Sequence, residues 1–432
     1  MSVQGKRLLV LGGTSASLDL VKQAKKLGVY TIVTDESPVE ERVAKQIADE
    51  CAMVSTSDME GLAALVREKR IDGVFCGPSE FNIQNMIELC EKTGLRCYAD
   101  SETWRRCANK DVFKQFCREY GVDCTPEYDV SEDSSDAALQ ALDYPIIVKP
   151  VDGSSSAGIT TCRDWTTVRE ACVYARKASK SGKIIVEKFI ENSGEIFSAS
   201  YLLKDGKAYP YLIRDTYIVD PVHRKTLISG FSFMPSHLQD YYLRSMNEKV
   251  GKMLYGMGLR NGLAFFQALP YKGKIYFHEM GFRLSGGLIF KITEPLCHIN
   301  DMQMMIRFAL GEEICSDEEV RAIDVNCSGK IGAKLMVPLE VGTIREIVGL
   351  EELLKIPCVE NFIQYYHVGD EVTPKVIGTL SQHFGRFTLL GDTREEIFET
   401  VEQIQRELRV YGTDGKLMND MPFDLNRVQA NV

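Results

Sequence analysis

The sequence predicts an α/β domain, then an α+β domain and a smaller α/β lobe, and three observations favour this fold class. Between residues 7 and 100, short apolar runs alternate with amphipathic stretches, which indicates βαβ units and a mostly parallel sheet. Strand-like runs dominate from there to about residue 280, with hairpin signals such as "KDGK" at 204–207. The length of 432 residues exceeds what one hydrophobic core usually holds, so two or three domains are expected.

The first domain is expected to cover residues 1–108. Its predicted strands are "RLLVLGG", "YTIVTD", "GVFCGP" and "RCYAD", and its predicted helices include "SLDLVKQAKKLG" and "FNIQNMIELCEKTG". The first turn, "GGTSAS" at 12–17, precedes a helix, and Asp35 ends the next strand, where a dinucleotide site places an acid. Because the GxGxxG pattern is absent, we favour a tight turn with a helix cap over a nicotinamide site.

The second domain is expected over residues 109–310 and the third over 311–432. In the second, "NKDVFKQFCREYGV" predicts a helix that Gly121 ends, and a long amphipathic helix is predicted over 238–255. The predicted strands are 146–150, 183–190, 196–203, 208–218, 263–270 and 274–280. In the third, the predicted elements are a strand in "GKIGAKLMVPLE", a helix in "GLEELLKI", and strand and helix in "GRFTLLGDTREEIFETVEQIQRELRVYG".

Composition narrows the functional classes. The net charge is -10, so we expect no broad basic surface for nucleic acid, and an anionic ligand needs a local site. The thirteen cysteines include no CxxC pair, which argues against a zinc site or disulfide framework and favours the cytoplasm. No stretch approaches the ~20 apolar residues that span a bilayer, so no membrane association is expected.

A candidate anion site lies in "YPIIVKPVDGSSSAGIT" at 144–160. Lys149 ends an apolar strand, and the loop from Asp152 to Gly158 has small side chains that allow backbone N–H groups to close on a phosphate. An ordinary loop is the alternative, because glycine- and serine-rich loops after strands are common. The strand "KIIVEKFI" offers backbone groups and an apolar wall for a planar base at 187–190, and Glu195 is placed to accept from ribose hydroxyls.

The most informative segment is "NGLAFFQALPYKGKIYFHEMGFRLSGG" at 261–287. A three-residue loop centred on Gly273 would set Gln267 directly across from Glu279, close enough for one cation to bridge both. Alternation along an extended strand then places Phe277, Glu279, Gly281 and Arg283 on one face. Oxygen ligands beside a guanidinium suit a magnesium polyphosphate, whereas the alternative is a half-buried hairpin with one satisfied glutamate.

Together, in order and spacing, these four segments resemble the ATP-grasp superfamily, in its carbamoyl phosphate synthetase-like and carboxylate-amine ligase branches. The resemblance extends well to about residue 310, and residues 1–108 look like the N-terminal domain that precedes the ATP-grasp domain. It implies ATP and Mg²⁺ as cofactors. It also implies that Lys110 and Lys149 are the nucleotide lysines, and that a loop folds over the phosphates. The implied loop residues are Asp152, Gly153, Ser154, Ser155, Ser156, Ala157 and Gly158.

The resemblance further assigns adenine, ribose, metal and catalytic positions. Glu187 and the backbone of Lys188, Phe189 and Ile190 would meet the adenine, and Glu195 the ribose. Gln267 and Glu279 match the metal ligands, and Arg283 matches the arginine that faces the acyl phosphate, so Arg283, Lys149 and Glu279 are the expected catalytic residues. One position departs: many members have asparagine where this chain has Gly281, which removes an oxygen ligand from a second magnesium.

The expected function is therefore a magnesium-dependent ligase that phosphorylates a small carboxylate and couples the acyl phosphate to an amine. Two alternatives stay open. One is an enzyme that phosphorylates bicarbonate or a carbamate, which Gln267 slightly favours, and the other is an ATP-binding protein with impaired catalysis, which Gly281 suggests. The expected partners are small-molecule carboxylate and amine substrates, and a homodimer would be ordinary for the class.

Overall fold

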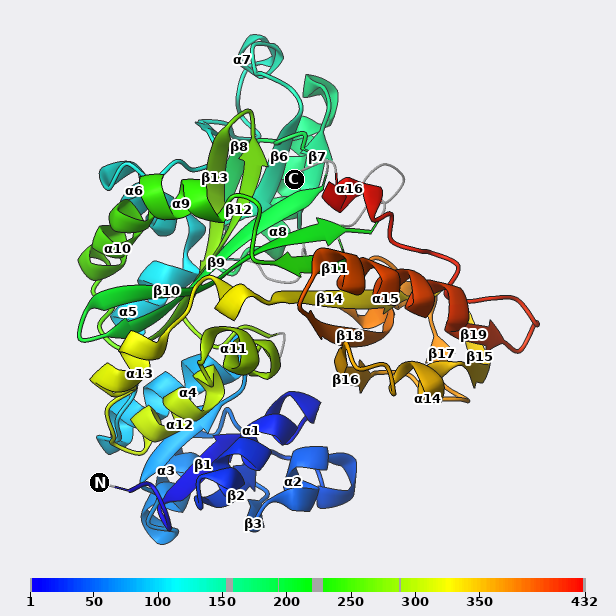
Figure 1. Ribbon diagram of the computed structural model, residues 1–432. Helices are drawn as coiled ribbons and strands as arrows, with labels where there is room; N and C mark the ends of the chain where they lie inside the picture. The colour runs from blue at the N-terminus through cyan, green and yellow to red at the C-terminus, as the bar shows by residue number, and fades with distance from the viewer. Residues whose placement is uncertain (1, 153–157, 193, 220–227, 287–288, 430–432) are drawn as a thin grey trace.

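The computed structural model describes residues 2–152, 158–192, 194–219, 228–286 and 289–429. The N-terminal part is a four-stranded parallel sheet in the order β3-β2-β1-β4, shown at the bottom of Figure 1. The strands are β1 (Arg7–Leu11), β2 (Tyr30–Thr34), β3 (Glu50–Ala52) and β4 (Gly73–Cys76), and the helices are α1 (Ser15–Lys26), α2 (Val43–Ile47), α3 (Met59–Glu68) and α4 (Glu80–Thr93). The parallel sheet is as predicted, but "RCYAD" forms no strand. The short β3 completes the four strands of the sheet instead.

Two helices connect this sheet to the rest of the molecule. They are α5 (Ser101–Ala108) and α6 (Lys110–Glu119). The Asn109 side chain accepts hydrogen bonds from the N–H groups of Asp111 and Val112, which is why α6 begins at Lys110. The left-handed Gly121, with φ +64°, follows the helix, so the predicted helix end is confirmed.

A small lobe, at the top of Figure 1, contains a four-stranded antiparallel sheet in the order β5-β8-β6-β7. Its elements are β5 (Glu127–Tyr128), α7 (Asp136–Gln140), β6 (Ile146–Pro150), β7 (Thr160–Cys162), α8 (Val168–Ala178) and β8 (Ile184–Lys188). Apolar residues of α8 pack on β6 and β8 and form a core of their own, separate from the other two cores of the molecule.

The largest sheet has eight antiparallel strands in the order β13-β12-β9-β10-β11-β14-β18-β16. The first five in sequence are β9 (Glu195–Lys204), β10 (Lys207–Ile218), β11 (Ser229–Met234), β12 (Gly262–Tyr271) and β13 (Lys274–Gly281), and the helices beside them are α9 (Gln239–Ser245), α10 (Asn247–Gly256), α11 (Phe290–Cys297), α12 (Asp301–Ala309) and α13 (Asp317–Ala322). The single helix predicted over 238–255 is thus two helices, divided at Met246 with φ -119°.

The C-terminal segment does not form an independent sheet throughout. Its strands β14 (Ile331–Pro338), β16 (Val359–Gln364) and β18 (His383–Gly391) continue the eight-stranded sheet, while β15 (Gly342–Val348), β17 (Glu371–Val372) and β19 (Arg409–Gly412) form a three-stranded one. The helices are α14 (Leu350–Leu353), α15 (Arg394–Glu407) and α16 (Asn426–Gln429). One sheet therefore crosses the boundary expected at residue 311.

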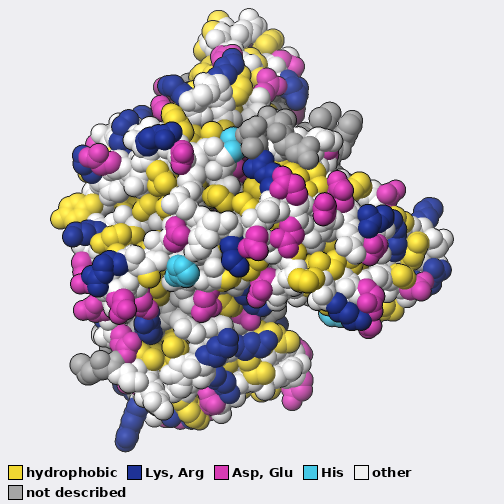
Figure 2. Space-filling model, in the orientation of Figure 1, with side chains coloured by type: hydrophobic (Ala, Val, Ile, Leu, Met, Phe, Trp, Pro, Cys, Tyr) yellow, Lys and Arg dark blue, Asp and Glu magenta, His cyan; other side chains and the backbone are white. Residues whose placement is uncertain are grey.

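Lys and Arg side chains are interspersed with Asp and Glu over the face drawn in Figure 2. All thirteen cysteines are free thiols. In the described part of the chain, no helix is long and apolar enough to cross a bilayer.

Candidate functional site

Lys149 belongs to a buried ion-pair network in the small lobe. Its Nζ lies 2.6 Å from Glu187 Oε2, and the other carboxylate oxygen of Glu187 lies 2.5 Å from Lys114 Nζ. Lys114 also contacts Glu127 at 2.9 Å and donates to the Thr125 carbonyl at 2.7 Å. Lys149 and Glu187 share one face of the sheet because Ile147, two residues before Lys149, pairs with Glu187 across β6 and β8.

The charges in this network decide the ionisation of Glu187. Burial raises the pKa of its carboxyl, but the ammonium groups of Lys149 and Lys114 outweigh burial and hold the pKa below its ordinary value. The group is 2% exposed, so its two cations are what keep it charged inside the protein. Lys114 was not predicted, although a lysine between Phe113 and Cys117 on a buried helix face is a detectable signal.

His278, on β13, adjoins this network from the large sheet. Burial, then the charge of Lys149, lower the pKa of His278 to about 3, with smaller effects from Lys110 and Lys114. Its Nδ1 is buried and has no hydrogen bond to a described residue. The imidazole is therefore neutral, and the two predicted nucleotide lysines, Lys110 and Lys149, lie near it from different elements.

The two described ends of the predicted phosphate loop are fixed to the C-terminal end of α8. Asp152 accepts hydrogen bonds from Ser179 Oγ at 2.6 Å and from Ser181 N at 2.8 Å. Gly158 has φ +75°, and a Cβ there would lie 2.5 Å from Ala178 Cβ. The Asp152 carboxylate thus holds the loop base. Gly153, Ser154, Ser155, Ser156 and Ala157 lie outside the described residues.

The predicted adenine edge is partly engaged in the sheet. The N–H groups of Lys188 and Phe189 donate to the carbonyls of Pro126 and Pro145. The Lys188 ammonium points toward the carbonyls of Asp143 and Tyr144, at 3.0 and 2.9 Å. Within the described residues, the Ile190 N–H has no acceptor, so it is the one N–H of this segment left for a ligand.

Glu195 lies apart from this group. Cross-strand partners share a face, and alternation along β9 puts Ser198, the partner of Gln267, on the opposite face from Glu195. Glu195 Oε1 lies 3.4 Å from His237 Nδ1, which is 3.0 Å from Asp215 Oδ2. Burial, then the charge of Asp215, raise the pKa of Glu195 to about 7. Glu195 therefore lies on the opposite face of β9 from the partner of Gln267, and its ribose contact stays a prediction.

Gln267 and Glu279 face each other across β12 and β13, as predicted, but the turn and the strand register differ from the prediction. The turn has two residues, Lys272 and Gly273, with φ of 47° and 75°, so Tyr271 pairs with Lys274. A β-bulge at His278 then shifts the register by one residue and brings Glu279 opposite Gln267. The bulge also corrects the predicted alternation: Phe277 pairs with Ala268 in the core, on the other face from Glu279.

The Gln267 and Glu279 pair fits a hard divalent cation. Among the described residues, neither side chain has a hydrogen bond or an ion pair, so a carboxylate and an amide oxygen are available together. Oxygen ligands of this kind are the ones Mg²⁺ prefers. No nearby described cation competes for Glu279, which leaves its charge to a bound metal.

Gly281 and Arg283 follow the pair. Gly281 lies opposite Phe265, and a Cβ at Gly281 would come within 2.4 Å of the Phe265 ring. The Arg283 guanidinium stacks on the same ring, 5.0 Å from its centroid, and pairs with Glu80 of α4 at 3.2 Å. The place of the usual asparagine is therefore filled by Phe265, and the predicted catalytic arginine contacts the N-terminal domain.

A cavity of about 720 Å³ opens on the same face of the large sheet. Gln267 lies in its wall, followed by Ser285 and Gly286, so the cavity adjoins the predicted metal pair. Residues from β9, β10, β11, β14 and β18 line most of the remaining wall, among them Arg214, Lys334 and Arg386. No sequence motif indicates that these three cations come together, because they are far apart in the chain.

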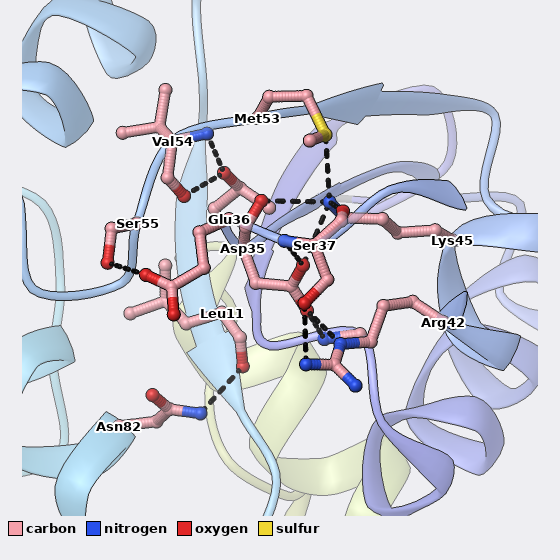
Figure 3. Close-up of polar contacts among 12 residues, drawn as sticks. Leu11, Asp35, Glu36, Ser37, Arg42, Lys45, Met53, Val54, Ser55 and Asn82 are labelled. Carbon is pink, nitrogen blue, oxygen red and sulfur yellow. Dashed lines mark hydrogen bonds and ion pairs between the residues drawn. The ribbon is translucent and has the colours of Figure 1, made fainter. Parts of the chain in front are cut away.

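Asp35, at the end of β2, is occupied by the protein itself (Figure 3). Its carboxylate accepts from Gly13 N at 2.8 Å and Ser37 N at 2.9 Å, and it pairs with Lys45 at 2.9 Å and Arg42 at 3.2 Å. Burial raises the pKa of Asp35, but these partners, Lys45 first, lower it overall. The acid thus stabilises the first turn, which agrees with the structural alternative to a nicotinamide site.

This combination of a parallel N-terminal sheet, a small antiparallel lobe and a large antiparallel sheet is the ATP-grasp fold. Residues 124–207 match the family model described as the C-terminus of D-ala D-ala ligase. The chain thus has the ATP-grasp fold, and the predicted fold class and the resemblance to ATP-grasp proteins are confirmed.

Solved structures that match most of the chain agree with this classification. The crystal structure of L-amino acid ligase from Bacillus licheniformis matches with a TM-score of 0.77 at 20% identity, over 95% of this chain and 99% of that chain. The biotin carboxylase domain of Hydrogenobacter thermophilus 2-oxoglutarate carboxylase, solved with MgADP, ADP and bicarbonate, matches with a TM-score of 0.74 at 18% identity, over 99% of this chain and 98% of that one.

A curated relative is similar in sequence as well. Formate-dependent phosphoribosylglycinamide formyltransferase of Sulfurisphaera tokodaii is 22% identical over 376 residues, which are 82% of this chain and 87% of the relative. The predicted cofactors, ATP and Mg²⁺, agree with the MgADP of the carboxylase domain.

Proposed function

We propose that this protein is an ATP-dependent ligase that phosphorylates a small organic carboxylate and couples the acyl phosphate to an amine. The observation that carries the proposal is one continuous arrangement: Lys149 and Glu187 of the small lobe, the Gln267 and Glu279 pair, and a cavity of about 720 Å³ that begins at Gln267. A nucleotide between the lobes would thus present its terminal phosphate to a substrate in the cavity.

The residues would divide the work by position. Lys149 and Lys110 would neutralise phosphate charge, and Gln267 and Glu279 would hold Mg²⁺, which supplies further charge neutralisation when bound. The free N–H of Ile190 would meet the base. The substrate carboxylate attacks the terminal phosphorus, ADP leaves, and the amine then displaces phosphate from the acyl carbon. The protein orients these groups and provides no nucleophile of its own.

The size of the cavity favours an organic substrate over bicarbonate. Pockets of about 300–1,000 Å³ enclose ligands of small-metabolite size, and a volume of about 720 Å³ falls within this range. A bicarbonate ion would fill only a small part of it. Relatives point the same way in part, since the formyltransferase is named for formate, a carboxylate, and for phosphoribosylglycinamide.

ADP release against a panel of carboxylic acids and amines, with Mg²⁺ and ATP, tests the proposal. We expect turnover to require both one organic acid and one amine. Turnover that depends on bicarbonate without an organic acid would contradict it in favour of the carboxylating alternative. ATP binding by calorimetry with no turnover on any combination would contradict it in favour of an ATP-binding protein without catalysis.

A further inference from the structure

Three cations project from one face of the eight-stranded sheet, and the strand register shows this directly. Gln267 pairs with Ser198, and Ser198 pairs with Arg214, so all three share a face. Two residues after Arg214, Thr216 lies on the same face. It pairs with Ser232, which pairs with Lys334.

The same register extends to the third cation. Met336, two residues after Lys334, lies on the face of Lys334 and pairs with Arg386. The face that carries the predicted metal pair thus also carries Arg214, Lys334 and Arg386. All three line the cavity.

These cations are close enough to disturb one another. Burial, then the charges of Arg386 and Arg214, hold the pKa of Lys334 well below its ordinary value. Burial lowers the pKa of Arg214 as well, with a contribution from Arg386. Lys334 is only 5% exposed. Long side chains from β10, β14 and β18 therefore converge in the cavity, at a cost in repulsion and desolvation.

Acids of the described residues do not pair with the guanidinium groups of Arg214 and Arg386. Among the described residues, neither Arg214 nor Arg386 has an ion pair, and the buried Nε of each has no hydrogen-bond partner. The carboxyl that acts on Lys334 is that of Asp301, and burial raises the pKa of Asp301 to about 7, so it supplies less than a full charge at neutral pH. Burial lowers the pKa of His383, which is also in the wall.

We propose that Arg214, Lys334 and Arg386 bind an oxyanion, a phosphate monoester or a carboxylate, that one of the substrates carries in addition to its reacting group. Guanidinium groups match the paired oxygens of both anions. Beside them, the hydroxyls of Thr216 and Ser232, 2.9 Å apart, are placed to hydrogen-bond the same anion. The assignment of this anion to a substrate rests on the proposed function, whereas the anion site itself rests on the cavity.

Calorimetry on the full chain tests the site with two probes, inorganic phosphate and succinate, at constant ionic strength and saturating Mg²⁺, with and without a saturating nonhydrolysable ATP analogue. The variants are Arg214→Met and Arg386→Met, which keep the apolar stem and remove the charge. Arg345→Met is the matched control, because Arg345 is an arginine on β15 with a 51% exposed side chain. Binding of the analogue is measured in every variant and reports on the proposed function separately.

We expect at least one probe to bind, and the stronger of the two to identify the anion. Each cavity variant should lower the affinity for this probe about tenfold or more, the effect of losing a hydrogen bond to a charged group. The affinity of the cavity variants for the ATP analogue should be unchanged. The control variant should bind the probe as wild type does. Without anion, the unfolding temperature of both cavity variants should hold or rise, because a repulsive charge is removed.

Three results would overturn the inference. The first is failure of both probes to bind wild type, or equal binding by the cavity variants. The second is displacement of the probe by the ATP analogue, because the cations would then serve the nucleotide phosphates. The third is a lower unfolding temperature in both cavity variants, which would show a structural role. If only the analogue fails to bind, the proposed function fails while the anion site stands.

Discussion

At the scale of single residues, the small lobe shows how a buried carboxylate can prepare a ligand site. Glu187 is held by Lys149 on one oxygen and Lys114 on the other, so the protein itself fixes the position of the Lys149 ammonium. Fixing a cation in advance reduces the ordering cost of binding. Lys188, the next residue, differs sharply, since its ammonium turns away toward two carbonyls.

Replacing Lys149 with alanine should weaken ATP binding by about 1.5–3 kcal/mol, the cost of losing a hydrogen bond to a charged group. Lys188→Ala is the matched control and should leave the affinity unchanged, since the Lys188 ammonium contacts Asp143 and Tyr144. Calorimetry with ATP and Mg²⁺ measures both. Equal affinities in wild type and Lys149→Ala would remove Lys149 from the nucleotide site.

Glu279→Gln keeps the shape of the side chain and removes its charge. Turnover should fall about 100-fold or more, because removing even groups that only orient metal ligands costs about 10- to 100-fold. Stability should hardly change, since no described residue pairs with Glu279. Steady-state ADP release and thermal unfolding, each titrated with Mg²⁺, check this. A variant that unfolds early while its Mg²⁺ dependence stays normal would make Glu279 structural.

Gly281→Asn tests whether the departure from the superfamily pattern is a lost ligand. We expect the variant to lose about 1–3 kcal/mol of stability by overpacking, since its Cβ would meet the Phe265 ring. It should gain no activity, because Phe265 occupies the space. The double variant Phe265→Ala, Gly281→Asn should recover part of the stability. Denaturant unfolding compares all three proteins, and a more active Gly281→Asn would show that a metal ligand is missing.

At the scale of elements, the β12–β13 hairpin shows what a sequence pattern fixes and what it leaves open. Equal spacing from Gly273 predicted the Gln267 and Glu279 pair, and the pair exists. The predicted loop was one residue too long and the bulge at His278 was not foreseen, and these two errors cancel in the register. A bulge depends on the neighbouring strands, so no local pattern within β13 predicts it.

The same bulge leads to a pH prediction. Unfolded His278 takes up a proton near its ordinary pKa of 6.5, whereas the native group stays neutral until about 3. A lowered native pKa means that stability is full above 6.5 and falls as pH decreases toward 3, by up to about 1.4 kcal/mol per pH unit. His278→Gln should therefore show a shallower loss of stability between pH 6.5 and 4. Denaturant unfolding across that range compares the slopes, and equal slopes would contradict a neutral buried imidazole.

At the scale of the whole molecule, the separate apolar cores determine which parts are expected to move independently. The parallel sheet shares one apolar core with β9, β10, β12 and β13, while the small lobe has its own. Residues 126–190 should therefore exchange amide hydrogens faster than the shared core, and ATP with Mg²⁺ should slow that exchange by closing the lobe on the nucleotide. Hydrogen exchange with mass spectrometry measures this. Equal slowing across the N-terminal sheet would contradict it.

Long-range organisation also explains where sequence reasoning stopped. The ordered motifs sufficed for the fold class, since each one is local. The face of β9 on which Glu195 lies depends on the strand register, which no local pattern contains. Arg214, Lys334 and Arg386 meet only through three strand pairings, so no stretch of sequence contains their relation. The extension of the central sheet by β14, beyond residue 311, likewise depends on a long-range strand pairing.

Because that sheet is continuous, the spacing of its strands sets the distances between side chains on its face. From β12, which carries Gln267, the strand order leads to Arg214 after two steps and to Arg386 after five. At ~4.8 Å per step, the span is about 10 to 24 Å before side chains reach inward. Backbone hydrogen bonds between the strands set these distances. The length of a substrate, more than any single contact, would therefore determine which molecules this protein accepts.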